Sequence, residues 1–402
     1  MDWIYSIAAM LQRLRQWVWN EWFWFPSEKG WGWKDLQNTD PNVYYPQLED
    51  LHWTVFLGVV FLGIRYGYEH LIVVRVAKRF GLNERRKITV EKNPVLEKAY
   101  LQAKKADTKL HQELSKQTDL SVRQVEVWFR RRRLQDMPSK LDKFRECSWH
   151  LLFYVSIFVY GITILWNKPW FSETKYCWIG WPKQVCYIVF LQDFFKGIDR
   201  DVYWYYVLEL GFYWSLVYTL AVDHKRKDFY EMVIHHLVTI LLIYFSWVLN
   251  FVRVGTLVLA VHDASDYWMA AAKMAKYINK QTICEVSFVI FCITWIISRL
   301  IIYPYVVLYT TTVETYGIVM DVTFGSHWFF NFLLYILQVL HIIWTFMIAR
   351  IALQKFTAGN LQQDVRSDAD SDDTVEIEEE TKSEKTDVNC TLQNTYVSKK
   401  FG

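Results

Sequence analysis

The chain has 402 residues, of which 52% are hydrophobic and 18% are aromatic, and its formal net charge is only +3. Such an aromatic content is far above ordinary soluble usage and is typical of side chains at membrane interfaces. The small net charge argues against a chain that binds polyanions along its whole length, and six cysteines are too few for a disulfide scaffold.

The first residues, MDWIYSIAAMLQRLRQW, are mildly amphipathic and do not have the pattern of a signal peptide. Seven later segments are candidate transmembrane helices, which need roughly 20 mostly apolar residues. They lie at about 52–74, 148–167, 203–222, 231–250, 254–271, 283–307 and 327–351. The first and fifth are weak by hydropathy because they contain charged residues. We therefore predict an all-α fold, a polytopic membrane helix bundle with about seven transmembrane helices.

The loop charges predict the orientation of these spans. Lysine and arginine are dense in 75–147, at 225–227 and in 272–282, and all three segments lie on one side if the N-terminus is lumenal. The polar C-terminal tail is then cytosolic, and its Lys399-Lys400 pair resembles a KKxx-type retrieval address for the endoplasmic reticulum. A chance pair of lysines is the alternative. We expect a multi-pass protein of the endoplasmic reticulum membrane.

These features divide the chain into four parts. They are an N-terminal segment with the first transmembrane helix (1–75), a cytosolic three-helix homeobox-like domain (76–138), a transmembrane catalytic domain (139–355) and a disordered acidic cytosolic tail (356–402). The homeobox-like interpretation rests on three short helical patterns within 93–135, the last of which contains Trp128-Phe129 followed by four arginines.

This segment resembles a homeodomain without its beginning. A homeodomain reads adenine through an asparagine at the position where this chain has Arg131. The segment thus keeps phosphate-binding charge but loses the base reader, and we expect no sequence-specific nucleic acid as a partner. Contact with anionic lipid headgroups or phosphate-bearing ligands, helix packing, and a plain solvated basic loop all stay open.

Ionisable residues interrupt the fourth and fifth predicted spans. His235 and His236 lie in the fourth span, and His262, Asp263 and Asp266 lie in the fifth. Asp263 and Asp266 share a helix face, and the rise of about 1.5 Å per residue places the two sets at a similar depth, roughly 8–12 Å from the cytosolic ends. Such groups at membrane depth are costly and favour a functional interpretation.

A histidine beside a carboxylate can act as a general base or as a nucleophile in acyl transfer. The alternative is that these groups only satisfy one another inside the bundle. A metal site fits less well, because the ten histidines are scattered and form no HxxHH box. We therefore predict no metal and no cofactor.

The order of motifs in 225–277 closely resembles the Lag motif of the TLC domain in the ceramide synthases. The chain has RKDF, HH, SWxxN, RxGTLV, HDxxD and AKMxxY in that order. The resemblance covers about 20–355 and includes EWFWFP, WFRRRR, KPW and YWYYxLEL, with DVRSDADSDD after the last span. Two departures are a longer loop at 180–202 and Ala270, where many members have glutamate.

The resemblance implies an N-acyltransferase that joins a fatty acyl group from acyl-CoA, as co-substrate, to the amine of a sphingoid base (sphinganine or sphingosine), giving dihydroceramide or ceramide. The family's essential residues correspond to His235, His236, Asp263 and Asp266. We expect His235 to take the acyl group or the amine proton, His236 to position the thioester, and the aspartates to orient the imidazole. A non-catalytic TLC-type protein that binds or transports lipids is the alternative.

Further expectations concern binding and modification. We expect substrate contacts from Arg226, Lys227, Asn250, Arg253 and His262. The loop Tyr309–Ser326 is expected to influence the acyl chain length, and family members commonly form homo- or heterodimers. Ser367 and Ser371 precede acidic residues and resemble acidophilic-kinase sites, unless the tail is merely solvating. Cys177 and Cys186 fall in one loop, where a disulfide and two free thiols are both open.

Overall fold

The computed structural model describes residues 2–39, 43–83, 89–103, 107–184, 198–222, 228–320 and 323–358. Within these ranges the regular structure is helical and no β-strand is present, which confirms the all-α prediction. The chain divides into two compact units. One comprises Met1–Leu82 with Lys143–Arg350, and the other comprises Asn83–Asp142 with the residues from Ile351 onward.

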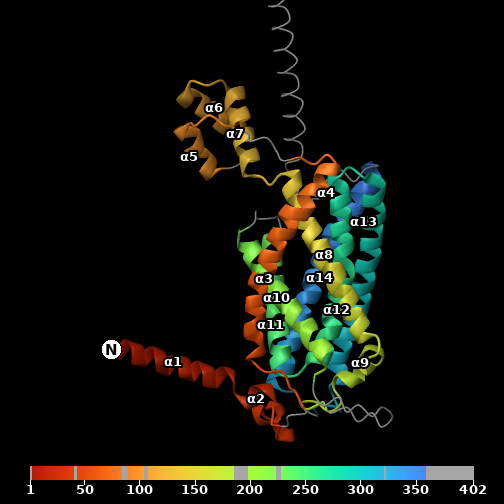
Figure 1. The fold of residues 1–402 in the computed structure, drawn as a ribbon. Coiled ribbons are helices and arrows are strands. Elements are labelled where there is room, and N and C mark those ends of the chain that lie inside the picture. Colours follow the sequence, from red (N-terminus) through yellow and green to blue (C-terminus); the bar gives the residue numbers. More distant parts are fainter. Residues whose placement is uncertain are drawn as a thin grey trace, which may run out of the picture. The chain divides into compact units, whose positions relative to one another are not determined.

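The first unit is a bundle of long helical segments that run alongside one another (Figure 1). Its long segments are α3 (Asp50–Tyr68) with η3 (Glu69–Val73) and α4 (Val74–Arg79), α8 (Lys140–Leu165), α10 (Arg200–Val222), α11 (Phe229–Val248), α12 (Val252–Tyr277), α13 (Gln281–Trp295) with the π-helical η5 (Ile296–Leu308) and η6 (Thr310–Glu314), and α14 (Gly325–Ala358). Each has at least the length that a bilayer span needs.

Five segments of the described chain are both long enough and apolar enough to cross a membrane. They are Asp50–Arg79, Val122–Leu165, Phe229–Val248, Gln281–Glu314 and Gly325–Lys355. The first predicted span thus meets both criteria despite its charges. Helices α10 and α12 have the length but are more polar, because they contain acidic residues that the bundle buries. The predicted number of seven spans therefore stays a prediction.

Helices α3 and α10 pack closely against each other because each has a glycine at the contact. A Cβ on Gly58 would lie 2.8 Å from the Cβ of Trp214, and a Cβ on Gly211 would lie 3.0 Å from the Cβ of Leu57. Small residues at such crossings let two backbones pack tightly where lipid offers no hydrophobic driving force. The close contact fixes the position of α10, which carries several residues of the polar site described below.

Aromatic residues close the end of the bundle where α11 turns into α12, which we call the turn end. The N-terminal helices α1 (Asp2–Val18), α2 (Glu21–Trp24), η1 (Ser27–Lys29) and η2 (Trp33–Leu36) precede the bundle, and α9 (Pro169–Ser172) and η4 (Thr174–Cys177) follow α8. The Ser326 hydroxyl donates to the Trp24 carbonyl at 3.0 Å, and the Trp181 indole donates to the Leu249 carbonyl at 2.8 Å. These bonds attach the N-terminal segment and the α8–α10 connection to the bundle.

The second unit contains the three helices expected within 93–135. They are α5 (Pro94–Gln102), α6 (Thr108–Thr118) and α7 (Val122–Asp136). Asn93, Asp107 and Ser121 cap the three N-termini through their side-chain oxygens. The helices share a core of Leu96, Tyr100, Leu114, Val125, Trp128 and Phe129.

Arg132, one of the four arginines in the run 130–133, has a structural role. Arg132 pairs with Glu97 at 2.9 Å and with Asp136 at 2.6 Å, and its guanidinium lies over the ring of Tyr100. The side chain therefore ties α7 to α5, and the run of basic residues is not a uniform patch of free positive charge.

Candidate active site

The two adjacent histidines of α11 lie against aromatic rings of other helices. The rings of His235 and His236 are 5.5 Å apart, and the ring of Tyr213 from α10 is 6.5 Å from His235 and 6.0 Å from His236. Trp344 of α14 lies 5.3 Å from His235 on another side. His235 is thus held between α10 and α14, and its Nδ1 atom is buried without a hydrogen-bond partner in the described structure.

Backbone carbonyls fix the tautomer of two imidazoles. Nδ1 of His236 lies 2.7 Å from the Met232 carbonyl oxygen, and Nδ1 of His262 lies 2.7 Å from the Val258 carbonyl oxygen. Because a carbonyl can only accept, Nδ1 carries the hydrogen in both rings and Nε2 has the lone pair. Nε2 of His262 is buried and has no protein partner among the described residues. This atom is therefore available to accept a proton.

Asp263 belongs to a buried cluster of acidic and phenolic groups. The Tyr205 hydroxyl donates to Asp263 Oδ2 at 3.1 Å, and the carboxyl of Glu209 lies close to that of Asp263, with Glu209 Oε1 buried and without a hydrogen-bond partner in the described structure. Only 1% of Glu209 is exposed. Two buried carboxyls that lie close together cannot both be ionised without a large cost in free energy, which favours a proton on one of them. The Glu209–Asp263 pair can thus hold one proton inside the bundle.

Asp266 has a different set of partners. The Ser265 hydroxyl donates to Asp266 Oδ1 at 3.0 Å, and Arg299 Nη2 lies 3.4 Å from the same oxygen. The same Nη2 donates to the His262 carbonyl at 2.6 Å, and the guanidinium lies 5.2 Å from the ring centre of Trp295. Arg299 thus supplies a charge that compensates the partly buried carboxylate of Asp266.

His262 and Asp266, which are four residues apart in α12, form no direct histidine–carboxylate pair among the described contacts. Arg299 instead binds the backbone carbonyl of His262 and the side chain of Asp266. Helix α12 also continues to Tyr277 instead of ending near 271. Asp266 is therefore roughly 16 Å from the end of its helix, deeper than the predicted 8–12 Å.

Three residues of the site were not identified from the sequence. Glu209 and Arg299 have the contacts given above, and His341 of α14 is 1% exposed with its ring 5.1 Å from that of His262. Each is an ionisable residue inside a predicted span, and the rule that such residues default to function would have found all three.

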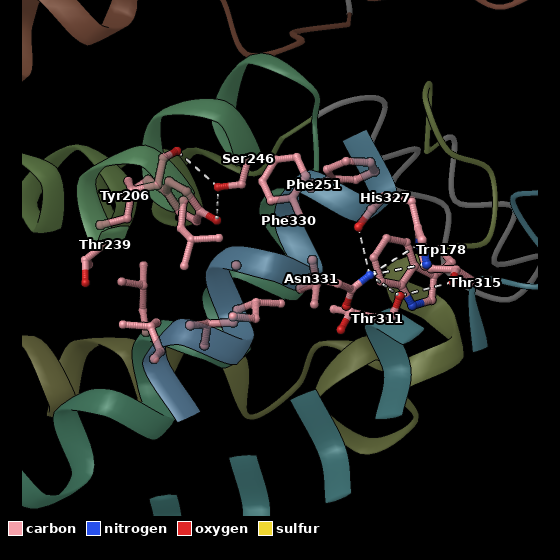
Figure 2. A pocket seen from close by; sticks show the side chains of 18 of the residues that line it. Trp178, Tyr206, Thr239, Ser246, Phe251, Thr311, Thr315, His327, Phe330 and Asn331 are labelled. Atoms are coloured by element: carbon pink, nitrogen blue, oxygen red, sulfur yellow. Dashed lines mark hydrogen bonds between the residues drawn. The ribbon is translucent and has the colours of Figure 1, made fainter. Parts of the chain in front are cut away.

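An elongated cavity begins at this cluster and runs toward the turn end. The space among its lining atoms amounts to about 840 Å³ when the part that opens to solvent is included. Tyr213, Thr239 and His262 line one end. The walls are mostly apolar and come from α11, α12, η6 and α14. Figure 2 shows Thr239 at one end and Trp178, Thr311, Thr315, His327 and Asn331 gathered at the other.

Two residues predicted to bind substrate, Asn250 and Arg253, instead make structural hydrogen bonds to backbone carbonyls. Asn250 has a positive φ of 55° in the α11–α12 turn and donates to the Pro182 carbonyl at 2.7 Å. Arg253 donates to the carbonyls of Tyr176 and Gln184, each at 2.9 Å. Neither residue lines the cavity, and Arg253 is roughly 20 Å along α12 from Asp266. Their assigned role in substrate binding therefore has no support from this geometry.

Several other predicted sites lie outside the described residues. They are Arg226, Lys227, Cys186, Ser367, Ser371, Lys399 and Lys400. Cys177 is a buried free thiol, and the tentative disulfide to Cys186 stays a prediction. Ala270 is buried in α12, where the family's glutamate would be. In the part of the chain that the structure describes, no group of three or more histidine, cysteine or acidic side chains is arranged to hold a metal ion.

The bundle and its buried histidine and aspartate residues define a membrane protein of the TLC-domain class. Residues 143–350 match the TLC domain family, and residues 83–136 match the homeodomain family.

Curated relatives narrow the class further. Ceramide synthase 5 of Mus musculus is 40% identical over 367 residues, which cover 91% of this chain and 85% of that relative. Ceramide synthase 4 of Homo sapiens is 37% identical over 371 residues, which cover 91% and 89%. Ceramide synthase 3 of Homo sapiens is 39% identical over 363 residues, which cover 89% of each chain. The chain therefore belongs to the ceramide synthase family and is a multi-pass membrane enzyme.

Proposed function

We propose that the protein transfers a fatty acyl group from acyl-CoA to the primary amine of a sphingoid base. The observation that carries this proposal is that the site and an apolar cavity meet. His262, whose Nε2 has no partner in the described structure, lines one end of a mostly apolar cavity together with Tyr213, whose ring packs against His235 and His236. The names of the relatives support the same reaction.

The reaction needs a group that removes a proton from the attacking amine. When the amine nitrogen bonds to the thioester carbon, the carbon–sulfur bond breaks, CoA leaves as a thiolate, and the nitrogen loses one proton. His235 is the proposed acceptor of that proton, or of the acyl group in a two-step reaction, because its Nδ1 is buried and unpartnered beside Tyr213. His236 lies next to it with Nδ1 satisfied and would position the thioester.

The aspartates act through other side chains in this proposal. Asp266 holds Arg299, which binds the backbone of His262, and Asp263 lies close to Glu209, with which it can share a proton. Asp266 thus helps to hold His262 in position through Arg299. Because one of the two carboxyls carries the shared proton, the Glu209–Asp263 pair adds only one negative charge beside the site.

The cavity is the proposed acyl-chain site. Its wall includes Thr311, Thr315, Val319, Met320 and Phe324, all within the segment 309–326 that we expected to influence chain length. The lining stretch from Phe251, the N-cap residue of α12, to His262 is roughly 16 Å long. At about 1.25 Å per carbon of an extended chain, this length accommodates about 13 methylenes. We therefore propose long-chain and not very-long-chain acyl groups.

Purified full-length protein tests this function. It is incubated with sphinganine and acyl-CoAs of increasing length, and the N-acylated product is measured by mass spectrometry. Product is expected with the wild type and is expected to fall at least 100-fold in His235→Ala. Binding of both lipids without any product would refute the transferase and favour the lipid-binding alternative. Acyl-CoA alone distinguishes the two chemical routes, since only the two-step reaction adds acyl mass to His235.

We also propose that the protein resides in the endoplasmic reticulum membrane with a lumenal N-terminus and a cytosolic C-terminus. The basic segments support this orientation, because CoA is anionic and cytosolic and would meet them first. Glycosylation acceptor sites placed before residue 20 and after residue 395 test it. Only the N-terminal site should be glycosylated. Homo- or heterodimerisation is a further proposal that cross-linking in the membrane would test.

A further inference from the structure

Helix α1 has a hydrophobic face that the described residues do not cover. Large apolar side chains recur along it at a spacing of three or four residues, which places them on one side of the helix. They are Trp3, Ile7, Met10, Leu14 and Trp17, and their exposed fractions lie between 44% and 76%. Two indoles and three aliphatic side chains on one face are costly to leave in water, so this face needs a partner.

The polar residues of α1 indicate what that partner is. Arg13 and Arg15 stand on either side of Leu14 in the sequence, so each is rotated by about 100° from the middle of the apolar face, one toward each border. Gln12 and Gln16 lie on the opposite side. Arginines at both borders can reach lipid phosphates while their stems follow the hydrocarbon. Two copies of α1 packed through this face would instead bring like charges together at the borders.

The C-terminal end of α1 is attached to the bundle at the depth of a membrane boundary. The ring of Trp19, the next residue after α1, lies 6.4 Å from that of Phe245, and the Trp33 indole donates to the Trp19 carbonyl at 2.9 Å. Phe245 is roughly 5 Å along the axis from the end of α11. Because α11 has 20 residues, about the number that crosses a bilayer, that end lies near the membrane boundary.

This depth is the one that an interfacial helix occupies, since such helices bury their apolar faces about 5–10 Å into the boundary between headgroups and acyl chains. We propose that α1 lies on the bilayer at the turn end, with its tryptophans at the acyl boundary and its arginines at the lipid phosphates. The partner is the phospholipid surface of the membrane that the bundle spans. This interaction surface goes beyond the proposed transferase and does not depend on it.

The lipid contact has a consequence for the turn end. The ring of Trp24 in α2 stacks on Phe245 at 4.9 Å, and its carbonyl accepts from the Ser326 hydroxyl of α14. An α1 held at the lipid surface therefore keeps α2 against the ends of α11 and α14.

Single cysteines along α1 test this proposal in full-length protein reconstituted into phosphatidylcholine nanodiscs. Met10→Cys and Leu14→Cys are on the apolar face, and Gln12→Cys and Gln16→Cys are matched controls on the opposite face. All four positions are exposed, so the substitutions should leave the fold intact. Each cysteine is labelled with bimane, and the signal of wild-type protein labelled in the same way is subtracted. A phospholipid with a nitroxide near its headgroup should quench the labels at 10 and 14 about threefold more than those at 12 and 16. Iodide in the water should quench in the reverse order.

Two results would overturn the proposal. Equal quenching at all four positions would mean that no face of α1 is in contact with lipid. Labels at 10 and 14 that are shielded from both quenchers would mean that protein covers the face, and cross-linking of Met10→Cys between two chains would identify a second copy as that protein. None of these measurements requires turnover, so failure of the transferase and failure of the lipid contact are observed separately.

Charge reversal tests the part of the arginines. Arg13→Glu combined with Arg15→Glu should lower the lipid quenching at residue 14 about twofold, because carboxylates at the borders are repelled by the phosphates. Unchanged quenching in this variant would refute the contact between the arginines and the headgroups.

Discussion

The strongest test of the site is removal of the Arg299 guanidinium. Arg299→Leu loses a 2.6 Å hydrogen bond to the His262 carbonyl and leaves Asp266 without its cationic partner. Breaking a buried ion pair from one side costs about 3–5 kcal/mol, but Asp266 is 25% exposed and the pair is separated by 3.4 Å. We therefore expect a loss of about 2–3 kcal/mol, which corresponds to a decrease in Tm of roughly 4–10 °C.

Arg253→Leu is the matched control for this measurement. Arg253 is also a guanidinium over a tryptophan ring with two backbone carbonyls as partners, but it lies at the turn end of α12. Thermal inactivation should show a similar decrease in Tm for both variants. Only Arg299→Leu should also lower kcat, at least tenfold, because it releases the backbone of His262 and frees the charge of Asp266.

A double-mutant cycle with Asp266→Asn measures the pair itself, and we expect a coupling free energy of about 1–2 kcal/mol. Additive losses in this cycle, or equal kcat values for the Arg299 and Arg253 variants, would refute the assignment of Arg299 to the site.

Three further predictions concern single positions. Gly255→Ala places a Cβ 1.5 Å from the Tyr206 hydroxyl, so we expect the free energy of unfolding to fall by about 1–3 kcal/mol, as followed by thermal inactivation. Adding Tyr206→Phe should restore part of this loss, and no loss in Gly255→Ala would contradict the packing. Glu209→Leu removes the carboxyl that lies close to Asp263 and should lower the free energy of unfolding by about 1–3 kcal/mol. Glu209→Gln supplies an amide that can donate to Asp263 and should cost less, and equal losses would exclude a shared proton between the two carboxyls. Burial raises the pKa of the Cys177 thiol, so iodoacetamide at pH 8 should modify Cys177 only after denaturation. Peptide mass spectrometry would show the modification, and modification in the folded protein would contradict the burial of this thiol.

The sequence predicted candidate site residues but not the contacts that support them. His235, Asp263 and Asp266 were predicted because an ionisable group inside an apolar run is conspicuous and costly. Their partners were not, because hydrogen bonds such as that from Tyr205 to Asp263 join residues 58 positions apart. Such pairings depend on how the helices pack, and periodicity within one helix contains no information about its neighbours.

The assignment of Asn250 to the substrate shows a second limit. A motif places residues in order along the chain but does not say which end of a helix faces the chemistry. Asn250 occupies a left-handed position at the turn, a conformation that asparagine tolerates better than most residues, and this accounts for its place in the motif. The three helices of 93–135 were predictable because local caps and a compact core determine them.

The π-helical stretch determines the alignment of one wall of the bundle. Trp295, Arg299, Tyr303, Val307, Thr311 and Thr315 recur every fourth residue, and all six are buried. In an ordinary α-helix a spacing of four rotates by about 40° per step, so the first and last of these side chains would face opposite sides. The wider turns offset this rotation and form a straight spine. Deletion of a single residue between Arg299 and Thr311 would rotate Thr311 and Thr315 away from this wall but would leave Arg299 in place. The segment is therefore constrained in its length as well as in its composition.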